Sequence, residues 1–322
     1  MQSLLQRAVN FLFPGVADRW LTVLRCGLGF QLTLYCVSSW SDWQLLYSSS
    51  GNGLISRDLA EAILSVESAL VPRLGWVVTA GEQLGLSEPV ILQLTWLFLL
   101  CAGLCLLFGA FSRTAAIVAW FLYLCAVKSG VLTSYGMDNF TIIGLFYLMV
   151  APLPDRFSFD VIVRKLPVRD ERLHGFHCRV LQIHLCLIYF FGGLTKALGP
   201  AWWNGESMWR ALTRSPFNVI SPDFLASWGS ALPLLGIGVC FLETGYPFFI
   251  WSRRTRAIWL AGILVMHVAI GLTMGLYLFG LIMIILNLAA FGPDLRTRVV
   301  ATAEPLIVQV GSKNLIRSTP DR

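Results

Sequence analysis

Long apolar runs, separated by shorter polar stretches, dominate the chain from Trp20 to Phe291. A helix needs about 20 mostly apolar residues to cross the hydrocarbon of a bilayer. The runs predict membrane-spanning helices at Trp20–Trp40, Pro89–Phe111, Thr114–Leu132, Asn139–Leu153, Arg179–Gly199, Ser230–Trp251, Ala257–Gly275 and Leu276–Phe291. The fourth and eighth runs are short, so seven or nine crossings are alternatives to eight. We expect an all-α fold, a polytopic membrane helix bundle with additional interfacial helices.

The polar stretches divide the chain into one membrane domain and two flanking segments. Residues 1–19 are rich in Leu and Phe and predict an amphipathic helix along the inner interface. Residues 20–293 form the membrane domain, and residues 294–322 form a polar, basic and partly disordered tail. Within the connection Asp42–Glu88, apolar residues at helical spacing predict a helix on the outer surface, namely Leu59, Ile63, Val66 and Leu70.

Composition agrees with a membrane protein, because 56% of the residues are hydrophobic and 13% are charged. Soluble domains carry about 25% charged residues. The net charge of +6 is read as a topology signal, since basic residues gather on the cytoplasmic side of membrane proteins. With both termini and Pro152–Cys178 inside, the outer connections hold only Arg57, Arg73, Arg210 and Arg214. The expected location is the cell membrane, either inner or plasma, with both termini cytoplasmic.

Several classes of site have no motif in this chain. The four histidines lack HExxH spacing or a carboxylate-rich ligand set, so we expect no metal site. The eight cysteines lie in apolar runs or at their boundaries, so no extracellular disulfide framework is implied. No base-reading or phosphate-cradling motif accompanies the positive charge, and we expect the lipid bilayer, rather than nucleic acid, as partner.

Lys196 is the strongest candidate for chemistry, because an ionisable side chain at membrane depth is costly and usually functional. Gln182, Tyr189 and Lys196 recur every seven residues and therefore share one helix face. Gly192 and Gly193 lie between the last two and permit close helix approach. The alternative is that Lys196, near the end of its run, extends its ammonium to the headgroups.

Other ionisable residues in the apolar runs are candidates for support. Lys128 and Asp138 are expected at the outer level of Lys196, with snorkelling as the alternative for Lys128. Glu243 and His267 are expected deeper and are predicted to contact each other, directly or through water, because unpaired polar groups at depth cost several kcal/mol. The alternative for this pair is a purely structural contact between helices.

The connection Pro200–Ser230 places tryptophans above Lys196. Trp202, Trp203 and Trp209 are typical of an aromatic belt at the membrane surface. Burial disfavours the charged form of a lysine, and a neutral amine can act as a base. The chemistry available at the outer face is therefore amine chemistry.

Three stretches of the chain resemble one known family. Leu181-QIHLCLIYFFGGLTKALGPAWWNGESM-Trp209 is similar to the signature of the vitamin K-dependent gamma-carboxylase-like membrane domain, also called the horizontally transferred transmembrane (HTTM) domain. Asp42-WQLLYSSSGNGLIS resembles the family's glycine turn, and Phe241-LETGYPFFIWSRRTRAIWLAGILVMH-Val268 resembles its Glu-x-x-Tyr/Phe-Pro helix, Arg-rich loop and histidine helix. The likeness covers about Trp20–Pro293.

The resemblance implies a role for Lys196. In the carboxylases the matching lysine is the base that deprotonates reduced vitamin K. Here their paired Lys-Lys is Thr195-Lys196, and we expect a compact member without their large lumenal domain. The resemblance thus favours the bacterial members of the sporulation-delaying protein B type, which mature an exported peptide toxin, over a true vitamin K-dependent carboxylase or epoxidase.

The expected function is that of a membrane enzyme or maturation factor acting at the outer face on an exported peptide, a lipid quinol, or both. A reduced quinone of the vitamin K type is the candidate cofactor, and companion maturation proteins are candidate partners. A non-catalytic membrane partner or a transporter is the alternative. Lys196 is the candidate base, and the candidate pocket and support residues are Gln182, Tyr189, Lys128, Asp138, Trp203, Glu206, Glu243 and His267.

Overall fold

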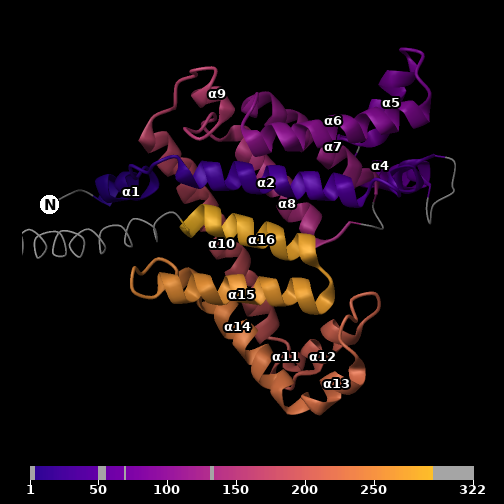
Figure 1. Ribbon diagram of the computed structural model, residues 1–322. Coiled ribbons are helices and arrows are strands. Elements are labelled where there is room, and N and C mark those ends of the chain that lie inside the picture. The colour runs from indigo at the N-terminus through magenta and orange to yellow at the C-terminus, as the bar shows by residue number, and fades with distance from the viewer. Residues whose placement is uncertain (1–3, 50–55, 69, 131–133, 293–322) are drawn as a thin grey trace, which may run out of the picture.

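The computed structural model of the chain describes residues 4–49, 56–68, 70–130 and 134–292, and all regular structure within these ranges is helical (Figure 1). Each of the eight predicted segments overlaps a helix: α2 (Arg19–Ser38), α6 (Glu88–Phe108), α7 (Ser112–Ser129), α8 (Gly136–Val150), α10 (Glu171–Ala197), α14 (Leu232–Phe249), α15 (Arg256–Met274) and α16 (Tyr277–Phe291). Among the described residues, five helical stretches are long and apolar enough to cross a membrane, and they lie in α2, α6, α10, η1–α14 and α15. The predicted polytopic helical bundle is confirmed.

Shorter helices make up most of the connections. They are α1 (Leu4–Leu12), α3 (Trp43–Tyr47), α4 (Arg57–Glu67), α5 (Leu74–Glu82), α9 (Phe159–Ile162), α11 (Pro200–Trp203), α12 (Glu206–Thr213), α13 (Pro222–Ser227) and the 3₁₀ turn η1 (Gly229–Ala231). The helix predicted after Asp42 is α4, and its apolar Leu59 and Ile63 are both more than half exposed. The predicted tail, residues 294–322, lies outside the described residues.

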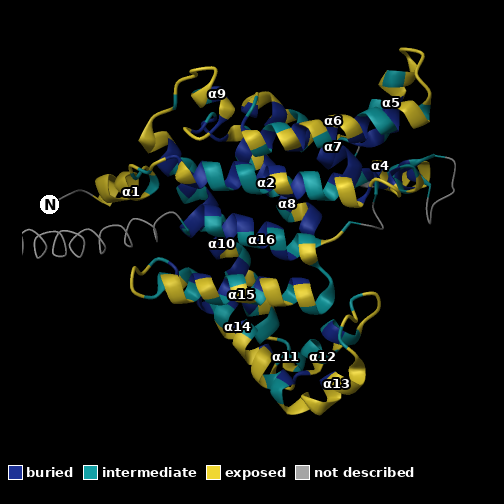
Figure 2. Ribbon diagram, viewed as in Figure 1, coloured by how far each residue is buried: buried dark blue, intermediate teal, exposed yellow. Residues whose placement is uncertain are grey.

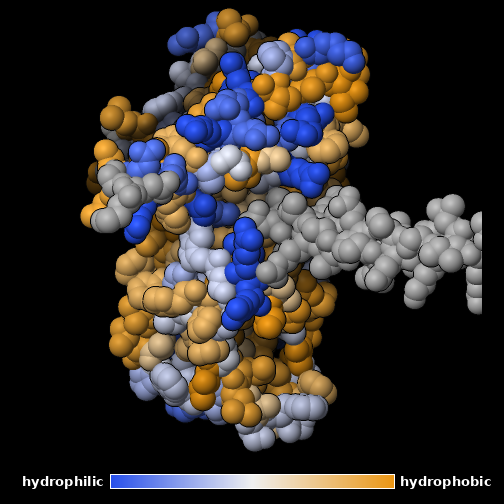
Figure 3. All heavy atoms as spheres, turned by 90° about the vertical axis from the view of Figure 1, so that its left-hand side faces the viewer, coloured by the Kyte–Doolittle hydropathy of each residue, from blue (hydrophilic) through white to orange (hydrophobic). Residues whose placement is uncertain are grey.

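The connections gather at two opposite ends of the bundle. In Figure 1, α1, α9 and the α14–α15 turn lie at the left, whereas α4 and α5 lie at the right and α11–α13 at the lower right. Figure 3 looks onto the first of these ends, where hydrophilic side chains cluster and hydrophobic side chains flank them. Exposed basic residues lie in its loops and in the first turn of α10, namely Arg156, Arg164, Lys165, Arg169, Arg172, Arg253 and Arg254.

The core lies where the long helices face one another (Figure 2). Helix α2 packs on α6 and α16, α10 packs on α14, and α15 packs on α16. Gly29 makes the contact between α2 and α6 especially close, because a Cβ at this position would lie 2.4 Å from the backbone nitrogen of Leu107. A small separate cluster of Leu212, Leu225 and Leu232 supports the α12–α14 region.

Helix α10 begins at Glu171, two turns before the predicted start at Arg179. The prediction followed hydropathy, and residues 171–178 are polar. They remain helical because they pack on the N-terminal segment, where a Cβ on Gly175 would lie 1.6 Å from the carbonyl oxygen of Pro14. Backbone contact thus extends the helix beyond its apolar part.

Candidate functional site

Lys196 pairs with Glu243 across the α10–α14 contact. The Nζ–Oε2 distance is 2.5 Å, and the side chains are 28% and 10% exposed. The two helices approach closely because Gly193 faces α14, where an added Cβ would lie 2.4 Å from the backbone nitrogen of Thr244. The pair therefore lies between two helices whose separation is set by a glycine.

The lysine side chain runs back along its own helix. A Cβ on Gly192, one turn earlier, would lie 3.8 Å from Nζ of Lys196 and 3.5 Å from Oε2 of Glu243. Helical side chains tilt toward the N-terminus of their helix, so the ammonium points into the bundle and not past the end of α10. The ammonium is therefore held by a partner on α14, with the side chain partly exposed.

Helix α11 lies next to the Lys196–Glu243 pair, where the sequence analysis expected the tryptophans of the Pro200–Ser230 connection. The ring centroid of Trp202 is 5.6 Å from Nζ of Lys196, within cation–π range. Trp203 is half exposed and donates its indole N–H to the carbonyl of Ala197, 2.8 Å away, so it fixes the turn after α10. Glu206 instead forms an exposed ion pair with Arg210.

A second buried network lies on the same face of α10. Tyr246 donates to Oδ1 of Asn287, and Nδ2 of Asn287 donates to the hydroxyl of Tyr189, both at 2.7 Å. The hydroxyl of Tyr189 also forms a hydrogen bond with Nε2 of His267, 2.8 Å away, in which the donor is set by the tautomer of the imidazole. Nδ1 of His267 has no hydrogen-bond partner among the described residues.

The expected contact between Glu243 and His267 is replaced by these two arrangements. Glu243 pairs with Lys196, and His267 pairs with Tyr189. Glu243 was also expected deeper in the bundle than the lysine, but the lysine stem reaches back far enough to meet it. Tyr189, two turns before Lys196 on α10, belongs to the network of Asn287 and His267, and its hydroxyl forms a hydrogen bond with His267.

The predicted stripe on α10 faces the bundle, since Gln182 and Tyr189 are 7% and 3% exposed. Gln182 is a tie between helices, because its Nε2 donates to the carbonyl of Ala290 at 2.6 Å and its Oε1 accepts from Arg179 at 2.8 Å. It precedes Lys196 by two heptads, about 21 Å along the helix. Gln182 therefore shares a face with the lysine but not a site.

Lys128 and Asp138 do not join Lys196. Asp138 accepts from the hydroxyl of Tyr123 and from the backbone nitrogen of Tyr135, both at 2.8 Å. Lys128, in the last turn of α7, forms no ion pair in the described part of the chain. Asp138 belongs to a different polar cluster, between α2, α3, α7 and α8.

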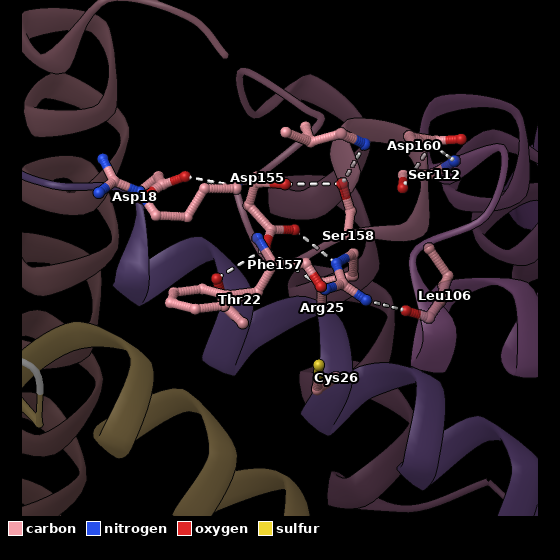
Figure 4. Close-up of polar contacts among 12 residues, drawn as sticks. Asp18, Thr22, Arg25, Cys26, Leu106, Ser112, Asp155, Phe157, Ser158 and Asp160 are labelled. Atoms are coloured by element: carbon pink, nitrogen blue, oxygen red, sulfur yellow. Dashed lines mark hydrogen bonds and ion pairs between the residues drawn. The ribbon is translucent and has the colours of Figure 1, made fainter. Parts of the chain in front are cut away.

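A buried ion pair that the sequence analysis did not predict joins Arg25 and Asp155 at the opposite end of the bundle (Figure 4). Nε of Arg25 lies 2.5 Å from Oδ2 of Asp155, and both residues are at most 1% exposed. Arg25 also donates to the carbonyl of Leu106 at the end of α6, and Thr22 donates to Asp155. The signal in the sequence is Arg25 itself, a charged residue six residues into an apolar run.

Beside this pair, Asp160 holds the start of α7. Its carboxylate accepts from the backbone nitrogen and hydroxyl of Ser112, which lies beside it in Figure 4. It also accepts from the backbone nitrogen of Phe111 and from Arg164. Burial acts to raise the pKa of Asp160, but these hydrogen bonds outweigh it and hold the pKa below its usual value. The contacts satisfy orphan donors at a helix N-terminus, so this cluster is structural.

Comparison with known proteins identifies most of the membrane region. The model of the HTTM domain family matches residues 82–294, a range that contains Lys196, Glu243 and His267. No curated protein matches the chain. No solved structure matches it either.

Proposed function

Because the chain belongs to the HTTM domain family, we propose that this multi-pass membrane protein is an enzyme or enzyme-like maturation factor in which Lys196 and Glu243 form an acid–base pair. The proposed substrate is an exported peptide, a lipid quinol, or both, handled at the outer face. The proposed subgroup is the sporulation-delaying protein B type, with an exported peptide precursor and companion maturation proteins as partners.

The Lys196–Glu243 contact is the observation that carries this proposal. Ionisable residues in membrane helices are expensive and usually mark function. Lys196 is the more exposed member and can be reached, whereas Glu243 is shielded behind it. A purely structural polar tie between helices would need only neutral hydrogen-bonding groups.

The pair can hold and release a proton at a defined place. In the structure the amine of Lys196 donates to Oε2 of Glu243. Lys196 therefore becomes a base only once its proton has left, and the Glu243 carboxylate is the adjacent acceptor. Trp202 covers the ammonium with its ring and limits the access of water.

The groups around the pair fit a hydroxyl-bearing aromatic ligand. The hydroxyl of Thr244 is buried against Gly193 in the α10–α14 contact and is not counted among the groups that a ligand would reach. Lys196, Glu243 and the ring of Trp202 are the residues that would hold a reduced quinone. When bound, such a group would supply an acidic phenolic hydroxyl and reducing equivalents.

The proposed orientation follows the charges at the two ends. Arg156, Arg164 and Arg253 lie at the end of α1 and α9, whereas Arg57 and Arg210 lie on α4 and α12 at the other. The positive-inside rule assigns the first end to the cytoplasm. Eight crossings with both termini inside then place Lys196, at the end of α10, on the outer side.

Activity of variants in membranes tests the proposal. The assay is maturation of the exported peptide or turnover of a reduced quinone, at matched abundance of each variant. We expect Lys196→Ala and Glu243→Gln each to lower the rate by about 10²-fold or more, the usual scale for loss of an acid–base group. Glu82→Gln, an exposed carboxylate on α5, is the control and should leave the rate unchanged. Wild-type rates in both site variants would refute the acid–base pair.

A further inference from the structure

A cavity of about 180 Å³ lies between α2, α3, α7 and α8, separate from the Lys196 site. Asp138, Tyr35, Tyr47 and Tyr135 line it together with the hydroxyls of Ser38 and Ser39. Pockets for drug-sized ligands measure about 300–1,000 Å³, so this cavity suits only a small molecule. It lies at the same end of the bundle as α4 and α5, where the loops before α8 and after α2 meet.

Asp138 supplies a carboxylate to this cavity without a cation to balance it. Asp138 is only 4% exposed, yet it forms no ion pair with any residue in the described ranges. The two hydrogen bonds from Tyr123 and Tyr135 leave part of its acceptor capacity free, because a carboxylate has about four lone-pair sites. Buried charges in proteins are normally paired.

Aromatic rings surround the carboxylate. The hydroxyls of Tyr35 and Tyr47 lie 3.0 Å apart, and the rings of Tyr35 and Tyr123 meet edge to face with centroids 5.0 Å apart. Trp43 packs against Tyr47 with centroids 4.5 Å apart and fixes its ring. Aromatic faces attract cations, and aromatic cages are a recurrent solution for binding organic ammonium groups.

The described lining contains no Lys, Arg or His. A positively charged ligand therefore meets a carboxylate and tyrosine side chains with no competing cation from the described lining. A small anion would meet only the negative charge of Asp138. The lining residues thus favour a ligand that is both small and positively charged.

We propose that this cavity, the tyrosine–aspartate pocket, binds a small organic ammonium cation. The ammonium group pairs with Asp138 and lies against the faces of Tyr35 and Tyr47. The cation comes either from a lipid headgroup, such as ethanolamine, or from a free amine in solution. The site is independent of the Lys196–Glu243 pair and of the reaction proposed there.

Binding to the purified full-length protein in detergent tests this proposal first without any variant. Choline chloride and ethanolamine hydrochloride are titrated against sodium chloride at matched ionic strength and against 3,3-dimethyl-1-butanol, the neutral isostere of choline. We expect at least one ammonium probe to give saturable heat by calorimetry and a rise in Tm. Neither sodium chloride nor the neutral isostere should give such a response. No saturable binding, or equal binding of the neutral isostere, would overturn the proposal.

Variants then locate the site. Asp138→Asn keeps the shape of the side chain and should weaken binding of the ammonium probe about tenfold or more. Asp223→Asn removes an exposed carboxylate on α13 and should leave binding unchanged. If Asp138→Asn does not fold, Tyr47→Ala is used instead. It removes one ring of the tyrosine–aspartate pocket and should weaken binding of the ammonium probe by the same factor. Unchanged affinity in the folded pocket variant would contradict the assignment.

Nanodiscs distinguish the two sources of the cation. In phosphatidylethanolamine discs a headgroup occupant competes, so the soluble probe should bind at least severalfold more weakly than in phosphatidylglycerol discs. Equal binding in both discs indicates a free amine. Either result supports the pocket, whereas absence of saturable binding in both discs counts against it.

Discussion

Lys196 of α10 and Glu243 of α14 form an ion pair between two helices that were expected to place these residues at different depths. The contact depends on the backward tilt of the lysine side chain and on Gly193, which lets the helices approach. Breaking a partly buried pair leaves one charge without compensation. Substitutions in the Lys196–Glu243 pair that preserve hydrogen bonding should therefore be milder than substitutions that remove it.

Glu243→Gln should destabilise the protein less than Glu243→Leu. The amide oxygen of glutamine can still accept from the lysine ammonium, whereas leucine leaves the ammonium facing an apolar side chain. Loss of a partner for a buried charged donor costs about 1–3 kcal/mol, so a lower Tm is expected for the leucine variant. Thermal unfolding in detergent measures the difference, and equal Tm values would argue against the pairing.

Gly193→Ala should destabilise the α10–α14 contact. The new Cβ would lie 2.4 Å from the backbone nitrogen of Thr244, and backbone cannot rotate away as a side chain can. Overpacking of this kind costs about 1–3 kcal/mol. Gly238→Ala on α14 is the matched control, because nothing lies within 4 Å of its added Cβ. A Tm for Gly193→Ala no lower than that of the control would show that the helices are not held this closely.

Asn287→Leu should be costly because Asn287 joins two buried tyrosines. Its loss removes the acceptor for Tyr246 and the donor to Tyr189. Each buried polar group left without a partner costs about 1–3 kcal/mol. In a double-mutant cycle with Tyr246→Phe, the leucine change should cost less when the tyrosine hydroxyl is already absent. Strict additivity in thermal unfolding would contradict the observed hydrogen bond.

Asp160 should contribute stability that depends on pH. Its pKa is lowered by the hydrogen bonds from Ser112, Phe111 and Arg164, which exceed the opposing effect of burial. A group with a lowered folded pKa stabilises above its unfolded pKa, and the stabilisation is lost as the pH falls through the folded value. Asp160→Asn should thus lower Tm at pH 7. The difference in Tm between this variant and wild type should become smaller as the pH falls below 3.8, the ordinary pKa of an aspartate. A gap that is constant from pH 7 to acid pH would contradict this assignment.

Hydropathy was sufficient to predict which segments are helical, because an apolar run long enough to cross a bilayer has to satisfy its backbone groups as a helix. Heptad spacing was also sufficient to place Gln182, Tyr189 and Lys196 on one buried face. The structure extends α10 to Glu171 because a backbone contact to Pro14 stabilises a polar stretch, which hydropathy does not report.

Side-chain partners were harder to predict. The choice between His267 and Lys196 as the partner of Glu243 depends on how α14 is rotated and on the direction of the lysine stem. Neither is encoded in periodicity. Asp155 lies two residues after the end of an apolar run, and Asn287 lies four residues before the end of another. A single polar residue near the end of a run resembles a boundary residue, and only the fold brings Arg25 and Tyr189 against these two.

The most direct test of the acid–base pair is the activity of Lys196→Arg at matched membrane abundance. Arginine can keep the ion pair with Glu243 and the contact with Trp202, but guanidinium stays protonated and cannot accept a proton. A structural lysine would therefore be replaced without loss. We predict that the arginine variant inserts and unfolds like wild type, while peptide maturation or quinone turnover falls by about 10²-fold or more. Activity close to that of wild type would contradict the role of Lys196 as a base.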